Sequence, residues 1–198
     1  MSKLSNDPDG VTALPASLSP ILADSGQMLI DNGYEIIPLH PSDKRPIGSD
    51  WQKRPITAER IAEAHRTYGA INIGCRTGEL VAVDIDVWAT HPQFDVIRAA
   101  IEGRLGKTPL VRWGRKGCLL LYRNAGEPLD KMRLELGLFD APYASQDEAQ
   151  QKKDRQRAVE ILGAPKYQVV LYGVHPLSGN EYDWGGDSAW DAGAVPTR

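Results

Sequence analysis

The chain has 198 residues and a net charge of -3, with 41% hydrophobic and 25% charged residues, as in a soluble protein with one sizeable domain. The charge argues against a uniformly basic nucleic-acid-binding surface, and no apolar run approaches the ~20 residues that a membrane helix needs. Residues 1–8 lack the apolar core of a signal peptide, and Cys75 and Cys118 give neither a zinc spacing nor a disulfide framework, so we expect a cytoplasmic protein with no membrane partner.

Apolar spacing and turn residues predict the elements of the first half of the chain. Residues 1–17 are rich in Ser, Pro, Asp and Gly and are expected to form a flexible lead-in. Helical spacing over about 18–32 ends at Gly33, a strand follows over 35–39, and Thr57 is placed to cap a helix that runs to about Tyr68. Two strands, 71–74 and 80–86, are expected on either side of a glycine-containing turn.

The second half is predicted to continue the alternation of strands and helices. A helix is expected over 91–104, and strands 110–113 and 118–122 form a hairpin around residues 114–117. The charged stretch 141–157 suits either a mobile loop or a surface helix from Gln146 onward, and short strands are expected over 158–162, 167–172 and 181–184. The sum is one α+β domain over residues 18–186, with a mixed or antiparallel central sheet flanked by helices. Residues 187–198 lose periodicity and are expected to be a linker toward a downstream domain.

Asp84 and Asp86, here called the acidic pair, end the apolar run 80–87. If this run is a strand, its side chains alternate between faces, so both carboxylates point the same way. Two like charges that close repel each other, and a divalent cation between them relieves the repulsion. Mg²⁺ and Mn²⁺ prefer such oxygens together with substrate phosphates. The alternative is that Asp86 caps a turn, and the pattern alone does not decide between the two.

Glu160 and His175 are further candidates, each with an ordinary alternative. Glu160 lies in an apolar strand, where a lone carboxylate is either exposed at a sheet edge or a third acid of the site. His175 lies at a strand end before Pro176, where it either binds a phosphate or a metal-bound group, or satisfies a backbone carbonyl inside the turn. Spacing leaves both choices open.

Basic side chains near glycines are candidates for phosphate contacts, because glycine lets the backbone approach a ligand closely. The hairpin and the strand after it carry four cations: Arg112, Arg115, Lys116 and Arg123. They suit phosphate oxygens, although an ordinary solvated turn is the alternative. Lys44 lies in a proline-bounded basic loop, and Arg76 lies in the glycine-spaced turn 72–78 that leads into the strand of the acidic pair.

The order of these segments resembles the N-terminal domain of bifunctional DNA primase/polymerases, the prim-pol proteins of phages, plasmids and prophages in the archaeo-eukaryotic primase superfamily. The resemblance covers residues 18–184 and rests on residues 33–39, 44–46 with Trp51, 72–78 followed by 83–86, 159–163, 173–176 and 182–184. It departs in the middle motif, where the family usually has a Ser-x-His after a glycine-rich turn. This chain has Arg115 and Lys116 there and no histidine.

The resemblance implies the prim-pol catalytic fold and a role for each candidate residue. The implied catalytic and metal-binding acids, for Mg²⁺ or Mn²⁺, are Asp84, Asp86 and Glu160. The implied nucleotide-binding residues are Arg115, Lys116, His175, Arg76 and Lys44. Because the family histidine is replaced, nucleotide affinity and sugar preference are where this chain is expected to differ.

We therefore expect a metal-dependent, template-directed nucleotidyltransferase, a DNA polymerase or primase acting in phage, plasmid or prophage DNA replication. Its expected partners are a single-stranded DNA template and primer, dNTP or NTP, and a replicative helicase domain or protein. Lys44, Lys53 and Arg54 are candidates for template contacts. Two alternatives stay open: a metal-dependent phosphodiesterase or nuclease that uses water as its nucleophile, and a non-catalytic module that docks on nucleic acid or on a helicase.

Overall fold

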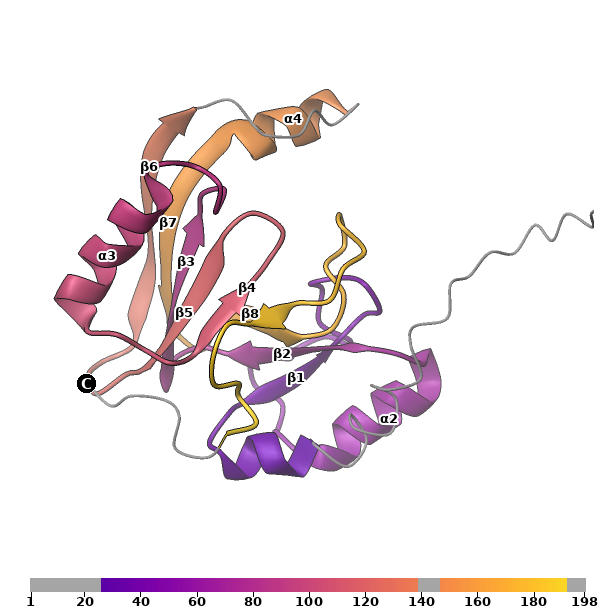
Figure 1. Cartoon of the computed structure of the whole chain (residues 1–198). Helices are drawn as coiled ribbons and strands as arrows, with labels where there is room; N and C mark the ends of the chain where they lie inside the picture. Colours follow the sequence, from indigo (N-terminus) through magenta and orange to yellow (C-terminus); the bar gives the residue numbers. More distant parts are fainter. Residues whose placement is uncertain (1–25, 139–146, 192–198) are drawn as a thin grey trace, which may run out of the picture.

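The computed structural model describes residues 26–138 and 147–191, whose strands form two antiparallel sheets. One sheet has the order β1 (Ile36–Leu39), β2 (Asn72–Arg76), β8 (Gln168–Tyr172). The other has the order β6 (Leu129–Leu138), β7 (Gln156–Gly163), β3 (Leu80–Asp86), β5 (Cys118–Arg123), β4 (Val111–Trp113), β9 (Asp183–Trp184). The helices are residues 26–31, α2 (Ala58–Tyr68), α3 (Phe94–Leu105) and α4 (Glu148–Arg155). Figure 1 shows α3 along one face of the larger sheet and α2 beside the smaller one, which confirms the α+β class with antiparallel sheets flanked by helices.

Strand β3 is the centre of the larger sheet and is covered on both faces. Val83 and Ile85 pack into the cluster that holds Phe94 of α3. Leu80 and Ala82 belong to the other cluster, which lies between the two sheets and includes residues of α2 and β8. Because side chains alternate along a strand, the acidic pair shares the face of Leu80 and Ala82. The pair therefore stands where the core between the sheets ends.

Strand register places a row of side chains across the larger sheet, here called the cross-strand row. Asp84 is opposite Leu119 on one side and Glu160 on the other. Leu119 is in turn opposite Arg112, and Glu160 is opposite Arg133. Residues directly opposite each other in antiparallel strands project from the same face. The row thus sets the carboxylates of Asp84 and Glu160 side by side, with Arg133 next to Glu160 at one end and Arg112 beyond Leu119 at the other.

The predicted helix ends are confirmed where the structure describes them. The Thr57 hydroxyl accepts a hydrogen bond from the Arg60 N–H at 3.4 Å and caps α2. Gly33 has φ +81°, the left-handed conformation that ends the first helix. Helix α3 begins at Phe94 rather than at residue 91, and α4 supports the helical alternative for the charged stretch. Residues 18–25 and 139–146 lie outside the described residues.

Two predictions about the sheets were incomplete. The strands 71–74 and 80–86 were expected on either side of a turn, and they belong to different sheets because Gly78, at φ +125°, redirects the chain. Strand β6 was not predicted. It lies at an edge with most side chains exposed, so charged residues such as Lys131 and Arg133 interrupt any apolar pattern, and its long pairing with β7 defines it.

The packed domain also continues past the expected boundary at residue 186. Ala189 is fully buried, and the Trp190 ring stacks on Tyr172 with 4.5 Å between centroids. The Asn32 side-chain amide donates hydrogen bonds to the carbonyls of Ala189 and Trp190. Residues up to Asp191 therefore belong to the domain, whereas the expected lead-in and residues 192–198 lie outside the described part. Within that part, no helix is long and apolar enough to span a membrane.

Gly117→Ala should destabilise the protein, because a Cβ at this position would overlap the carbonyl oxygens of Ile85 and Val87. We expect a loss of about 3 kcal/mol or more in the free energy of unfolding, measured by urea denaturation. The matched control is Gly103→Ala on the exposed surface of α3, where nothing lies within 4 Å of the added Cβ. That change should stabilise the protein by about 0.5–1 kcal/mol. Equal effects of the two substitutions would contradict the packing of the hairpin on β3.

Candidate functional site

A cavity of about 330 Å³, here called the first cavity, opens beside the acidic pair. Its walls come from the end of β3, the hairpin turn 114–117, α4 and the loop after β8. Six predicted site residues line it: Asp84, Asp86, Lys44, Arg115, Lys116 and His175. Glu160 lines an adjoining cavity of about 370 Å³, here called the second cavity, which shares Asp84 and Lys44 with the first. The structure therefore brings together residues that are spread over more than a hundred positions of the sequence.

Arg76 is the predicted site residue that the structure places elsewhere. Its Nε donates to a carboxylate oxygen of Glu35 at 3.0 Å and its Nη1 to the carbonyl of Gln52 at 2.6 Å, and it lines neither cavity. Arg123 likewise donates to the backbone carbonyls of Asn32 and Gly33. Arg76 is close in sequence to β3, which carries the acidic pair. Because β2 and β3 lie in different sheets, Arg76 is nevertheless not near the acidic pair in the folded protein.

Asp84 is the more enclosed of the two carboxylates in the acidic pair. Burial raises its pKa, the charge of Arg112 acts against this, and the neighbouring charge of Asp86 adds to the rise. Lys44, from the loop between β1 and α2, is another cation that acts on Asp84, while burial lowers the pKa of Lys44 itself. Any further positive charge that enters the cavity would stabilise the ionised carboxylate of Asp84.

Asp86 contacts Lys116 from the hairpin turn, with 3.4 Å between carboxylate oxygen and Nζ. The same Nζ donates to the carbonyls of Lys153 and Gln156, next to the start of β7. Burial raises the pKa of Asp86 and lowers that of Lys116, and in both groups burial outweighs their mutual attraction. The attraction between Asp86 and Lys116 therefore does not fully offset the cost of burying their charges, so either side chain could exchange its partner for a ligand of opposite charge.

Glu160 is largely buried, and its carboxylate is paired with two cations. It receives hydrogen bonds from Lys131 at 2.8 Å and from Arg133, both on β6. Burial by itself would raise its pKa, but these two contacts outweigh burial and lower it. Glu160 is directly opposite Asp84 in the paired strands, as expected for a third acid of the site. Its negative charge is paired with the two cations of the edge strand β6.

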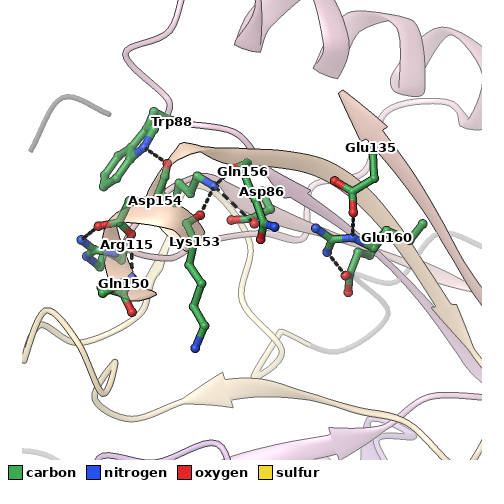
Figure 2. A network of polar contacts seen from close by, with 11 residues as sticks. Asp86, Trp88, Arg115, Glu135, Gln150, Lys153, Asp154, Gln156 and Glu160 are labelled. Atoms are coloured by element: carbon green, nitrogen blue, oxygen red, sulfur yellow. Dashed lines mark hydrogen bonds and ion pairs between the residues drawn. The ribbon is translucent and has the colours of Figure 1, made fainter. Parts of the chain in front are cut away.

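Arg115 is anchored by an aspartate that sequence reasoning missed. Its Nη1 and Nη2 donate to the two carboxylate oxygens of Asp154 at 2.6 and 2.9 Å, and Gln150 donates to the same carboxylate at 2.7 Å. The Trp88 indole N–H donates to the Asp154 carbonyl at 3.0 Å. Figure 2 shows this group on one side of Asp86 and the group of Glu135 and Glu160 on the other. The four-residue spacing of Gln150 and Asp154 after a helix-capping Asp147 was the available signal.

His175 lines the first cavity and also stabilises its own turn. Its Nδ1 accepts a hydrogen bond from the Leu177 N–H at 3.2 Å, so a neutral ring carries its proton on Nε2. Burial, and then the charges of Lys44 and Arg115, lower its pKa to about 4. His175 is therefore neutral at pH 7 and offers an Nε2–H donor rather than a positive charge.

Arg112 and Tyr182 line both cavities, and the role of Tyr182 was not foreseen. The Arg112 guanidinium lies 4.3 Å from the centre of the Tyr182 ring and is only 7% exposed. Among the described residues, Nε and Nη1 of Arg112 and the Tyr182 hydroxyl have no hydrogen-bond partner. The charge that balances Arg112 belongs to Asp84, two strands away in the cross-strand row.

The donor set meets part of the needs of a hard divalent cation. Within residues 26–138 and 147–191, no three His, Cys, Asp or Glu side chains form a ready metal-binding group, because Asp86 and Glu160 contact lysine and arginine instead. The acidic pair nevertheless offers carboxylate oxygens on one face of β3 toward the first cavity, which is the ligand type that Mg²⁺ and Mn²⁺ take. The pair fits such an ion, and Glu160 would join it only by leaving its β6 partners.

An antiparallel α+β domain whose half-buried carboxylates line a cavity together with lysine, arginine and histidine is suited to bind a polyphosphate and a hard metal ion. The chain belongs to the bifunctional DNA primase/polymerase family, whose N-terminal domain model matches residues 27–196. Membership in this family implies primase or polymerase activity in general. No curated protein matches the chain.

The neutral state of His175 predicts a pH-dependent loss of stability. The unfolded histidine takes up a proton near its ordinary pKa of 6.5, whereas the folded one does so only near about 4. The free energy of unfolding should therefore fall as pH drops through this window, with His175 contributing about 2 kcal/mol of the loss between about pH 7 and about pH 4.5. Urea denaturation of wild type and His175→Gln at both pH values isolates this contribution. The same pH dependence in both proteins would contradict a buried neutral histidine.

Proposed function

We propose that this domain is a metal-dependent, template-directed nucleotidyltransferase that extends or starts DNA chains in phage, plasmid or prophage replication. The observation that carries the proposal is the gathering of opposite charges around the first cavity, which is lined by the acidic pair and by Lys44, Arg115 and Lys116. A nucleoside triphosphate with a divalent ion brings a cation for the carboxylates and anionic oxygens for the basic side chains.

The acidic pair is the proposed ligand set for Mg²⁺ or Mn²⁺, with Glu160 as the third acid. When bound, the ion supplies Lewis-acid activation of the attacking hydroxyl and neutralisation of the leaving pyrophosphate. Lys116 now contacts Asp86, so ion binding would free its ammonium group for a phosphate. The same exchange would relieve the incomplete compensation that burial leaves on both side chains.

Arg115, Lys116 and Lys44 are the proposed phosphate contacts, together with the neutral His175. The guanidinium of Arg115 is held in place by its bidentate contact with Asp154, and the N–H groups outside that contact would donate to a phosphate. His175 would donate from Nε2 without adding charge. Arg76 is not part of this set, because it contacts Glu35 outside the cavity.

The proposed step joins the 3′-hydroxyl oxygen of a primer to the α-phosphorus of the bound nucleotide. The bond from that phosphorus to the oxygen bridging it to the β-phosphorus breaks, and pyrophosphate leaves with the electron pair while the hydroxyl proton passes to solvent. The cations around the first cavity stabilise the charge that grows on the departing oxygens. A single-stranded DNA template sets the order of addition, and a replicative helicase domain or protein is a further proposed partner.

Asp84→Asn should abolish this reaction while leaving the fold intact, because the amide keeps the shape of the side chain and loses its charge. We expect extension of a labelled primer on a single-stranded template, with dNTP and Mn²⁺ or Mg²⁺, to fall by at least about 10²-fold. The rise in Tm that metal and dNTP cause in wild type should vanish as well. Asp95→Asn, in exposed α3 on the far face of the sheet, is the matched control and should extend like wild type.

The products of the same assay separate the alternatives. Metal-dependent shortening of the primer would identify a nuclease or phosphodiesterase instead. Binding of DNA without metal-dependent turnover of any kind would favour a docking module. Undiminished extension by Asp84→Asn would overturn the assignment of the acidic pair.

A further inference from the structure

The second cavity is not accounted for by the binding of a nucleoside triphosphate. It lies between the acid-bearing face of the larger sheet and strand β8, and has a volume of about 370 Å³. Its cations come from separate elements: Lys131 on β6, Lys166 in the turn between β7 and β8, and Lys44. The ring of Tyr167 lines it as well.

The two cavities meet at Asp84. Both are lined by Asp84 and Lys44 and by the stacked pair Arg112 and Tyr182, which forms a shared wall. In phosphoryl transfer the attacking and leaving oxygens lie roughly in line on opposite sides of the phosphorus. If the leaving pyrophosphate occupies the first cavity, the attacking hydroxyl must come from a different side of Asp84. The second cavity provides that approach.

We propose that the second cavity binds the 3′-terminal nucleotides of a DNA primer strand, with backbone phosphates at Lys131 and Lys166 and the last sugar beside Asp84. This assignment rests on the proposed function. Spaced lysines act as point charges along a phosphate backbone, and a tyrosine ring offers a face on which a base stacks. The first cavity, which is lined by Arg112, Arg115, Lys116 and Lys44, suits the denser charge of a triphosphate.

Lys166 is well placed to exchange its present partner for a phosphate. Its Nζ lies 2.5 Å from Asp130 and 5.4 Å from the centre of the Tyr167 ring, and the two charged side chains are 57% and 75% exposed. An ion pair this exposed contributes little to stability, so its loss costs little. Lys131, by contrast, holds Glu160 at 2.8 Å, so a change there would also disturb the third acid.

The test compares Lys166→Glu with Lys107→Glu, which makes the same change of charge at an exposed lysine after α3 that lines neither cavity. Binding of a fluorescent primer–template is measured by anisotropy in EDTA without nucleotide, over a range of salt. We expect Lys166→Glu to bind at least about 5-fold more weakly and to lose about 0.7–0.9 from the slope of log affinity against log salt, as for one phosphate contact. Lys107→Glu should match wild type.

Steady-state extension adds a second readout. Lys166→Glu should raise the KM for primer–template and leave the KM for dNTP unchanged. Equal DNA binding by the two variants, no DNA binding by wild type, or a change confined to the dNTP KM would each overturn the proposal. If the protein extends no primer but binds DNA with an affinity that depends on Lys166, DNA binding at the second cavity is supported and the polymerase assignment is overturned. The failure of one proposal is thus distinguishable from the failure of the other.

Discussion

Two carboxylates at the end of a strand that is otherwise buried on both faces impose the main electrostatic constraint on this domain. Burial raises the pKa of Asp84 and of Asp86, and the cations that oppose it, Arg112, Lys44 and Lys116, are themselves disfavoured by burial. Such a cluster gains little stability from its own contacts, since desolvation offsets attraction. It is held together by the apolar packing around β3, and this leaves it suited to accept a cation and an anion from outside.

The surroundings of the acidic pair are fixed by segments next to the two strands that flank β3, namely the hairpin turn before β5 and helix α4 before β7. The hairpin turn 114–117 lies so close to the end of β3 that only glycine fits at position 117. Helix α4 holds the same turn through the bidentate contact of Asp154 with Arg115, while Trp88, just after β3, donates to the Asp154 carbonyl. A segment that is mostly charged in sequence thus becomes one wall of the first cavity, because one of its acids is buried against an arginine.

The contacts of Arg115 and Lys116 bear on the one departure from the family pattern that the sequence led us to expect. The middle motif lacks the histidine that the resemblance implies, and Arg115 and Lys116 were expected to replace it. Both do line the first cavity, but Asp154 and Asp86 already engage them. In the cross-strand row the residue beside Asp84 is Leu119, and the cation comes from Arg112 one strand further on. Positive charge around the first cavity is therefore supplied from several elements rather than from one motif.

The sequence by itself determined the features that depend on local periodicity and turn chemistry. These include the common face of the acidic pair, the hairpin that carries Arg115 and Lys116, the Thr57 cap and the Gly33 helix end, because alternation and capping act over a few residues. Only the tertiary structure decided that Glu160 faces Asp84, that Arg76 turns away to Glu35, that β6 exists and that Asp154 anchors the hairpin. Each of these depends on pairing or burial between segments far apart in the chain. A charged edge strand has no apolar periodicity, and the helical spacing of Asp154 does not say which arginine it contacts.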